Sequence, residues 1–404
     1  MITSELKFLR DQLAPADSKI VLMVLDGLGG LSAEPGGSTP LEAADTPNLD
    51  ALAKEGICGL HEPAGPGITP GSGPAHLALF GYDPRQYQVG RGVLSALGIG
   101  LDLQDGDVAA RGNFCTVDDD GKVTDRRAGR IGSEKGRELC AILNEIAIPG
   151  IEVFVEPVKE YRFVLVLRGE DLSAHIADTD PQQTGKKPRE VEATSGKAED
   201  TASLVQQFLD QAREKLADHH PANMVLLRGF SSQPDWPSFR EVFGLRGTAL
   251  ADYPMYRGVA RLLDMNAPDC GHPLENKIKV VGESWEDFDF FYLHVKRTDS
   301  VGEDGDAATK RNLIEQADQQ LPALRELGAD VLIVTGDHST PAAMESHSWH
   351  PVPTVLWAKN ARLDSVTTFG EKACIAGGLG PRFAATDLMP LALAHAERLK
   401  KFGA

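Results

Sequence analysis

The sequence predicts an α/β protein whose core is a mostly parallel sheet flanked by helices, with a smaller α+β domain inserted into it. Short apolar runs that end in Gly or Asp are followed by segments of helical period, a pattern typical of alternating strands and helices. Residues 108–168 differ, since short strands alternate there with charged turns. At 404 residues, 42% hydrophobic and 25% charged, the chain is long enough for two domains, or for one core with a large insertion.

The core elements follow from the apolar runs in chain order. Ile20 to Leu25 is the first strand, and an amphipathic helix at 48–55 follows the turn residues Asp45, Thr46 and Pro47. The remaining core elements are expected far downstream, with strands at 288–295, 331–334 and 352–357 and a helix at 307–327.

The middle of the chain predicts the inserted domain. Its short strands end with the run at 161–167, the stretch 181–199 is polar and poor in strand formers, and a helix resumes at 201–216. We therefore expect a discontinuous core at 1–90 and 200–404, an inserted domain at 105–180, and hinges at 85–105 and 181–200.

Composition excludes several classes of protein. Lys and Arg number 41 against 59 Asp and Glu, a formal charge of −18, which argues against nucleic-acid or anionic-membrane partners. The longest purely apolar run, Ile20 to Leu25, is far below the roughly 20 residues of a membrane span, and residues 1–17 lack a signal-peptide core. Five scattered cysteines without a Cys-x-x-Cys pair indicate reduced thiols in a cytoplasmic protein, with no role in zinc binding. The oligomeric state is left open.

Acidic residues follow three predicted core strands. Asp26 ends the first strand, Asp299 lies just past the second, and Asp337 with His338 lies just past the third. Each aspartate alone could be an ordinary turn residue, but the carboxyl ends of parallel strands meet at one rim, where ligands bind. Clustered carboxylates repel one another unless cations neutralise them, so the group favours metal binding.

Further ligands lie close by in the chain. Asp299 and Glu303 are four residues apart, which places both on one face of a helical turn, and His347 follows Asp337 and His338. Together these oxygens and imidazoles suffice for two divalent ions. We interpret His350 as part of a polar surface loop instead.

Ser72 lies in the segment Thr69-Pro70-Gly71-Ser72-Gly73-Pro74-Ala75-His76, just before an apolar helix. Free backbone N–H groups at a helix start favour an anion such as a phosphoryl group. Gly-Ser-Gly alone is often a flexible turn or helix cap. A serine hydroxyl becomes a good nucleophile when a base or metal lowers its pKa, so the neighbouring metal ligands make Ser72 a candidate nucleophile.

Arginines are dense in the middle of the chain, although the whole chain is acidic. Guanidinium groups suit carboxylate and phosphate oxygens, and a solvated basic turn is the alternative. The arginines concerned are Arg111, Arg126, Arg127, Arg130 and Arg162.

Several motifs, in order along residues 18–395, resemble the archaeal-type 2,3-bisphosphoglycerate-independent phosphoglycerate mutases of the alkaline phosphatase superfamily. The resemblance implies an alkaline-phosphatase-like α/β core and an isomerase of glycolysis and gluconeogenesis that interconverts 3-phosphoglycerate and 2-phosphoglycerate through a phosphoserine. The motifs are Val24-Leu25-Asp26-Gly27-Leu28-Gly29, Thr39-Pro40-Leu41-Glu42-Ala43-Ala44, Thr46-Pro47-Asn48-Leu49-Asp50, Gly71-Ser72-Gly73-Pro74-Ala75-His76, Asp125-Arg126-Arg127-Ala128-Gly129-Arg130, Asp178-Thr179-Asp180-Pro181, Leu227-Arg228-Gly229 and Gly336-Asp337-His338-Ser339-Thr340-Pro341.

The resemblance also implies roles for individual residues. Ser72 matches the nucleophile, and no 2,3-bisphosphoglycerate cofactor is expected. One divalent ion would be bound by Asp26, Ser72, Asp337 and His338, and the other by Asp299, Glu303 and His347.

Substrate binding is implied for the inserted domain, which we expect to close over the core and exclude water between the two phosphoryl transfers. Asp178 is a candidate acid/base for the glycerate hydroxyl, with an ordinary turn residue as the alternative. The expected contacts are Arg111, Arg126, Arg127, Arg130 and Asp178, with Lys296 and Arg228 reaching in from the core.

One position departs from the family motif Asp-x-x-Gly-His, because Glu303 replaces the histidine. A carboxylate makes the site harder and more anionic, which favours Mn²⁺ or Mg²⁺ over Zn²⁺ or Co²⁺. It also leaves open another phosphorylated metabolite as substrate, so a metal-dependent phosphatase or a kinase-like phosphotransferase is the alternative. A non-enzymatic relative is disfavoured by the retained Ser72.

Overall fold

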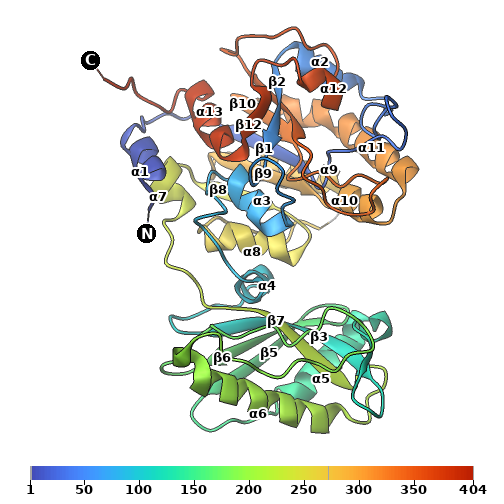
Figure 1. Ribbon diagram of the computed structural model, residues 1–404. Coiled ribbons are helices and arrows are strands. Elements are labelled where there is room, and N and C mark those ends of the chain that lie inside the picture. The colour runs from blue at the N-terminus through green and yellow to red at the C-terminus, as the bar shows by residue number, and fades with distance from the viewer. Residues whose placement is uncertain (1, 272, 404) are drawn as a thin grey trace. The chain divides into compact units, whose positions relative to one another are not determined.

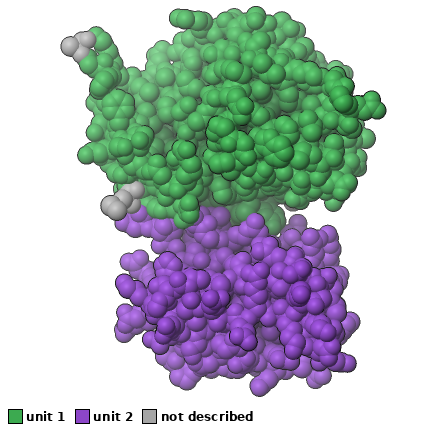
Figure 2. Space-filling model, viewed as in Figure 1, with its two compact units in different colours: residues 1–88, 236–404 green, residues 89–235 purple. Residues whose placement is uncertain are grey.

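The computed structural model describes residues 2–271 and 273–403. The chain forms two compact units, one from residues 1–88 and 236–404 and the other from residues 89–235, coloured separately in Figure 2. The first unit is therefore discontinuous, and the second is one contiguous insertion.

The first unit contains a seven-stranded sheet in the order β12-β2-β11-β10-β1-β9-β8. β11 is antiparallel to both of its neighbours, β10 and β2, and the other pairings are parallel. The predicted α/β class with a mostly parallel sheet is confirmed. The strands are β1 (Ile20–Leu25), β2 (Ile57–Glu62), β8 (Gly247–Leu250), β9 (Phe290–Val295), β10 (Val331–Thr335), β11 (Val352–Ala358) and β12 (Gly380–Ala384).

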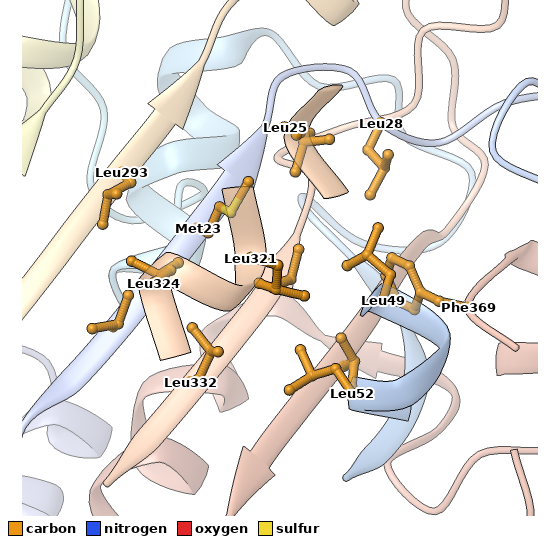
Figure 3. Close-up of a cluster of buried hydrophobic side chains, with 14 of the residues drawn as sticks. Met23, Leu25, Leu28, Leu49, Leu52, Leu293, Leu321, Leu324, Leu332 and Phe369 are labelled. Atoms are coloured by element: carbon orange, nitrogen blue, oxygen red, sulfur yellow. The ribbon is translucent and has the colours of Figure 1, made fainter. Parts of the chain in front are cut away.

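Helices cover both faces of this sheet (Figure 1). The fully buried strand β1 alternates its side chains between the faces. Val21, Met23 and Leu25 join the cluster that includes leucines of α2 and α11 (Figure 3). The helices are α1 (Ser4–Asp11), α2 (Pro47–Lys54), α3 (Ser72–Leu79), α7 (Phe239–Phe243), α8 (Pro254–Leu262), α9 (Leu274–Glu283), α10 (Arg297–Glu303), α11 (Ala307–Glu326), α12 (Glu371–Cys374) and α13 (Leu388–His395).

The second unit is an antiparallel sheet with helices, as expected for an α+β insertion. α5 and α6 bury Leu139, Phe208 and Ala212 in a core with the strands of this sheet. Its elements are α4 (Arg91–Ile99), β3 (Val108–Val117), β4 (Val123–Asp125), α5 (Ser133–Leu143), β5 (Glu152–Lys159), β6 (Arg162–Arg168), α6 (Glu199–Leu216) and β7 (Met224–Ser231), and the short 3₁₀ turns η1 (Ala128–Arg130) and η2 (Gly196–Ala198).

The unit boundaries differ from the predicted ones. The sequence predicted that the core resumes at residue 200, whereas residues 200–235 belong to the second unit in the structure. The reason is that α6 and β7 bury apolar side chains in the second unit's core, and an amphipathic pattern does not say which sheet a helix covers. The predicted hinge at 85–105 contains the regular helix α4, which packs on β3 and β7.

Two sequence expectations can be compared directly with the structure. All five cysteines are free, as the composition predicted, and the structure shows in addition that all five are buried. No helix among residues 2–271 and 273–403 is long and apolar enough to cross a membrane.

Candidate functional site

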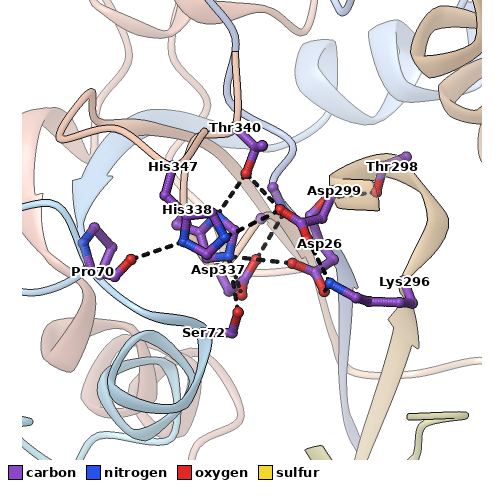
Figure 4. Close-up of polar contacts among 12 residues, drawn as sticks. Asp26, Pro70, Ser72, Lys296, Thr298, Asp299, Asp337, His338, Thr340 and His347 are labelled. Atoms are coloured by element: carbon purple, nitrogen blue, oxygen red, sulfur yellow. Dashed lines mark hydrogen bonds and ion pairs between the residues drawn. The ribbon is translucent and has the colours of Figure 1, made fainter. Parts of the chain in front are cut away.

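The carboxyl ends of three adjacent strands carry the acidic residues predicted for the site. β1 lies between β10 and β9 in the sheet and is parallel to both. Asp26 directly follows β1, Asp299 lies in the first turn of α10 after β9, and Asp337 with His338 follows β10. The topology therefore brings residues more than 270 positions apart to one edge of the sheet, where they face one another (Figure 4).

Asp26, Asp337 and His338 form a first group of possible metal ligands, with donor atoms all within 4.8 Å of one another. Nε2 of His338 lies 3.3 Å from Oδ1 of Asp26 and 3.2 Å from Oδ2 of Asp337. All three side chains are fully buried, and these two carboxylate oxygens have no hydrogen-bond partner among the described residues. Buried carboxylate oxygens without donors fit a bound cation.

Asp299, His338 and His347 form a second group, again within 4.8 Å. Nε2 of His347 lies 3.4 Å from Oδ1 of Asp299 and 3.7 Å from Oε1 of Glu303. The rings of His338 and His347 stack with their centroids 3.7 Å apart. His338 therefore belongs to both groups, whereas the sequence assigned it to one, and Glu303 lies beside the second group rather than within it.

Hydrogen bonds set the orientation of both histidines. Nδ1 of His347 donates to the carbonyl oxygen of Pro70 at 3.0 Å. The Thr340 hydroxyl donates to Oδ1 of Asp299 at 2.7 Å, so it accepts from Nδ1 of His338 at 3.0 Å. Each ring thus carries a proton on Nδ1 and turns Nε2 toward the carboxylates, the orientation that a metal-binding imidazole requires.

The Lys296 ammonium lies between two of the carboxylates, 3.0 Å from Oδ2 of Asp26 and 2.5 Å from Oδ2 of Asp299. Burial opposes its charge, but these carboxylates hold the pKa of Lys296 above its ordinary value. The lysine neutralises part of the negative charge of the site and is exposed enough, at 24%, to meet a ligand.

The charges of the group remain unbalanced without a further cation. Burial, together with the neighbouring charge of Asp26, raises the pKa of Asp337 well above its ordinary value. Burial lowers the pKa of His338 to about 4, so its ring is neutral near pH 7. Divalent cations such as Mn²⁺ and Mg²⁺ bind to closely spaced carboxylates and to imidazole nitrogens, and the residues present fit such ions.

Ser72 is the first residue of α3, after the N-cap Gly71. Its hydroxyl oxygen lies 3.3 Å from Nε2 of His338 (Figure 4). His76, one turn along the helix, donates from Nδ1 to the carbonyl oxygen of Ser72 at 2.7 Å and fixes the start of the helix. The candidate nucleophile therefore lies beside the possible metal ligands and at the positive end of a helix.

A layer of aromatic and imidazole groups lies behind the carboxylates, and sequence reasoning missed it. The Tyr256 hydroxyl donates to Oδ2 of Asp26, and Nε2 of His294 lies 3.3 Å from the same oxygen. Nδ1 of His76 lies 3.3 Å from Oδ2 of Asp337. A histidine within the apolar run of β9 is a usable signal for His294, but the sequence offered none for Tyr256.

The predicted anion-binding arginines lie in the second unit. Arg111 of β3 and Arg228 of β7 are directly paired in the sheet register. Arg228 was expected to belong to the core, but β7 is a strand of the second unit because it pairs with β3. Asp178 accepts a hydrogen bond from the Gly229 backbone at 2.7 Å and lies 3.5 Å from the Arg228 guanidinium.

Asp180 lies in one of the quoted family motifs, but the sequence assigned it no role. Both of its carboxylate oxygens accept from the guanidinium of Arg126, at 3.0 and 2.6 Å. The carboxylate is fully buried and also lies 3.6 Å from Arg228. Asp180 thus fixes the orientation of two of the predicted substrate-binding arginines.

Arg127 and Arg130 are exposed; Arg127 directly precedes a left-handed turn, and Arg130 is the last residue of that turn. Ala128, Gly129 and Arg130 have φ angles of 47°, 62° and 54°. The Asp125 carboxylate accepts from the backbone N–H groups of Arg127 and Gly129 at 2.8 and 2.6 Å, which stabilises this otherwise costly conformation. The turn directs charged side chains outward from the second unit.

Fold and site together define a two-unit α/β protein with a buried carboxylate–histidine centre at the carboxyl edge of a mostly parallel sheet. Residues 53–223 match the family model of 2,3-bisphosphoglycerate-independent phosphoglycerate mutase. The chain is 51% identical over 393 residues to a probable 2,3-bisphosphoglycerate-independent phosphoglycerate mutase of Thermus thermophilus, covering 96% of each chain. It is 49% identical over 397 residues to the corresponding Deinococcus radiodurans protein, again covering 96% of each.

Solved structures show the same relationship. A Pyrococcus horikoshii protein aligns with a TM-score of 0.82 at 31% identity, over 96% of this chain and 99% of that one. A cofactor-independent phosphoglycerate mutase from Thermoplasma acidophilum aligns with a TM-score of 0.69 at 31% identity, over 94% of this chain and 99% of that one. The chain belongs to the 2,3-bisphosphoglycerate-independent phosphoglycerate mutases, and the resemblance seen in the sequence motifs is confirmed.

Proposed function

We propose that this protein is a metal-dependent mutase that interconverts 3-phosphoglycerate and 2-phosphoglycerate through a phosphoserine at Ser72, without 2,3-bisphosphoglycerate. The observation that carries the proposal is the position of the Ser72 hydroxyl, 3.3 Å from Nε2 of His338 and at the start of α3. Membership of the mutase family supports the substrate.

Two divalent cations are proposed for the site. Asp26, Ser72, Asp337 and His338 would bind one, and Asp299, Glu303 and His347 the other, with His338 near both groups of ligands. When bound, such ions would lower the pKa of the serine hydroxyl and stabilise charge on the phosphoryl oxygens. Glu303 makes the second set richer in oxygen, which favours Mn²⁺ or Mg²⁺.

Ser72 would act as the nucleophile. Its oxygen attacks the phosphorus of 3-phosphoglycerate in line and the bond to the 3-oxygen breaks, which gives phosphoserine and glycerate. Backbone N–H groups at the start of α3 and the Lys296 ammonium would receive phosphoryl oxygens. In the second transfer the 2-hydroxyl of glycerate attacks the phosphoserine and restores the Ser72 hydroxyl.

The second unit would bind the glycerate portion. Arg111, Arg126 and Arg228 are cations held by neighbouring strands and by Asp180, and guanidinium groups bind carboxylates through paired hydrogen bonds. Arg127 and Arg130 would add contacts from the left-handed turn. Asp178, which already caps the Gly229 amide, would exchange a proton with the glycerate hydroxyl.

A single assay tests the proposal. Purified protein is incubated with 3-phosphoglycerate and Mn²⁺, without 2,3-bisphosphoglycerate, while 2-phosphoglycerate and free phosphate are both measured. We expect 2-phosphoglycerate with little free phosphate, and loss of the reaction after chelation. Free phosphate as the main product would indicate a phosphatase, and activity that requires ATP would indicate a phosphotransferase; either result would overturn the proposal.

A further inference from the structure

Lys310 is a buried cation close to the candidate metal site. It lies on α11 at the start of the apolar stripe that continues with Leu313, Ile314 and Ala317, and its side chain is fully buried. A buried ammonium is costly unless each of its N–H groups finds an acceptor. A lysine at this position therefore requires a specific set of partners.

Those partners are three backbone carbonyl oxygens. Nζ of Lys310 donates to Gly27 at 2.6 Å, to Gly29 at 3.3 Å and to Thr340 at 2.7 Å. The three acceptors match the three N–H groups of the ammonium. Gly27 directly follows Asp26, and Thr340 lies two residues after His338, so the lysine contacts both loops that carry the first group of metal ligands.

The two loops also touch each other at this point. The backbone N–H of Thr340 donates to the carbonyl oxygens of Gly29 at 3.0 Å and Gly27 at 3.3 Å. A Cβ atom at Gly27 would lie 2.5 Å from Oγ1 of Thr340, which leaves no room for a side chain there. The same Thr340 hydroxyl bonds Asp299 and His338, so the contact joins residues of all three strands.

We propose that Lys310 is a positioning residue for the metal site: by binding the carbonyls of both loops it fixes the spacing between Asp26 and His338. The inference rests on the proposed metal site. Because Thr340 bonds Asp299 through its hydroxyl, the lysine also positions the second group. Its contribution is geometric, since a neutral apolar side chain would remove the ammonium donor from three buried carbonyls. Only the weaker link through the Thr340 N–H would then join the two loops, and they would be freer to separate.

A purely structural role is the alternative, and Asp318 provides a matched control for it. Asp318 lies on the same helix, is 1% exposed, and accepts hydrogen bonds from the Asn48 side chain at 2.8 Å and the Leu49 backbone at 2.7 Å. It holds the start of α2 rather than the loops of the site. Lys310→Met and Asp318→Asn both disturb a buried polar contact of α11, but only Lys310→Met should change the positions of the proposed metal ligands.

The experiment is a calorimetric titration of Mn²⁺ into metal-free wild-type protein and into the Lys310→Met, Lys310→Gln and Asp318→Asn variants, with folding checked by circular dichroism. We expect Mn²⁺ to bind about 10–100-fold more weakly to both Lys310 variants and with wild-type affinity to Asp318→Asn. Lys310→Gln keeps an uncharged amide group with two N–H donors on a shorter side chain, and it serves as the test if the methionine variant does not fold.

Wild-type affinity in a folded Lys310 variant, or equal weakening in Asp318→Asn, would overturn the inference. Because the readout is metal binding, its outcome is separate from that of the mutase assay. Wild-type protein that binds Mn²⁺ without converting 3-phosphoglycerate would overturn the proposed function alone. Wild-type protein that binds no Mn²⁺ would overturn the metal site on which both rest.

Discussion

The hydroxyl oxygen of Ser72 lies 3.3 Å from Nε2 of His338, although 266 residues separate them in the chain. Nδ1 of His338 donates to Thr340, so the nitrogen that faces the serine carries no proton. Nε2 of His338 can therefore bind a cation next to the Ser72 hydroxyl. This arrangement leads to the first two predictions.

Replacing Ser72 by alanine should abolish mutase activity, with kcat at least about 10³-fold lower, because the oxygen that receives the phosphoryl group is lost. The half-buried side chain contributes little to packing, so the melting temperature should stay close to the wild-type value. The measurement is kcat for 3-phosphoglycerate conversion, together with isolation of phosphoprotein. Mutase activity retained by Ser72→Ala would exclude the phosphoserine route.

Replacing Thr340 by valine should weaken Mn²⁺ binding by about 10–100-fold, because the hydroxyl that orients His338 and Asp299 is removed without loss of volume. Thr340→Ser retains the hydroxyl and is the control, with affinity expected near the wild-type value. Calorimetry on the metal-free proteins measures both. Equal affinities of the valine and serine variants would show that the hydroxyl does not set the ligand geometry.

Replacing Glu303 by histidine should shift metal preference toward Zn²⁺, with the ratio of Zn²⁺-supported to Mn²⁺-supported activity rising about 10-fold, because imidazole is a softer donor than carboxylate. Asp304→Asn, at the next position, removes one exposed negative charge without changing the residue near His347. It should leave the ratio unchanged. A Glu303→His protein with the wild-type ratio would refute a metal-binding role for this position.

Replacing Arg130 by glutamine should raise KM for 3-phosphoglycerate about 10–100-fold, the effect of losing one hydrogen bond from a charged donor to a carboxylate or phosphate. Arg137→Gln is the matched control, since Arg137 is also an exposed arginine of the second unit, paired with Glu134 at 2.7 Å. Steady-state kinetics compare the two. If both variants raise KM equally, general charge rather than a specific contact binds the substrate.

The Arg126–Asp180 pair should make the second unit sensitive to acid. Burial works to raise the pKa of Asp180, but hydrogen bonds from Arg126 and from the Gln182 backbone outweigh it and hold the pKa below its ordinary value. The unfolded value is about 3.9, so this contribution is fully present above about pH 4 and is lost as pH falls through the lower folded pKa.

Asp180→Asn should therefore lower the free energy of unfolding by about 1–3 kcal/mol near neutral pH, a loss that is limited because Arg126 is 28% exposed and partly screened by solvent. The loss should be smaller near pH 3, because protonation of the wild-type carboxylate removes part of the same contribution. Hydrogen exchange of peptides from residues 89–235 measures this, because all four tryptophans lie in the first unit and their fluorescence would miss it. A stability loss in Asp180→Asn that does not change with pH would contradict the assigned pKa direction.

Much of the core could be predicted from local patterns. β1 has the predicted ends, and β9 and β10 match within two residues, because buried parallel strands read as continuous apolar runs. Aspartates at strand ends then predicted which residues meet. The end of the inserted unit was predicted too early in the chain, because the amphipathic pattern of α6 does not say which of the two sheets the helix covers.

The residues that support the proposed metal ligands were harder to predict. Tyr256 and Thr340 donate hydrogen bonds to aspartates that lie more than 40 residues away in the chain. The spacing of residues in the sequence does not predict such contacts. Lys310 did leave a signal, since a lysine occupies the apolar stripe of α11, and Asp318 does the same two turns later. Charged residues at such positions are therefore useful candidates for buried support.

The burial of every thiol has a practical consequence. A cysteine-specific reagent reaches a sulfur atom when the surrounding structure opens, and the five cysteines are divided between the units, with Cys115 and Cys140 in the insertion and Cys58, Cys270 and Cys374 in the rest. The native chain thus carries its own set of labelling probes. The rate of alkylation at each sulfur, read by mass spectrometry, reports how often that part of the molecule exposes its interior.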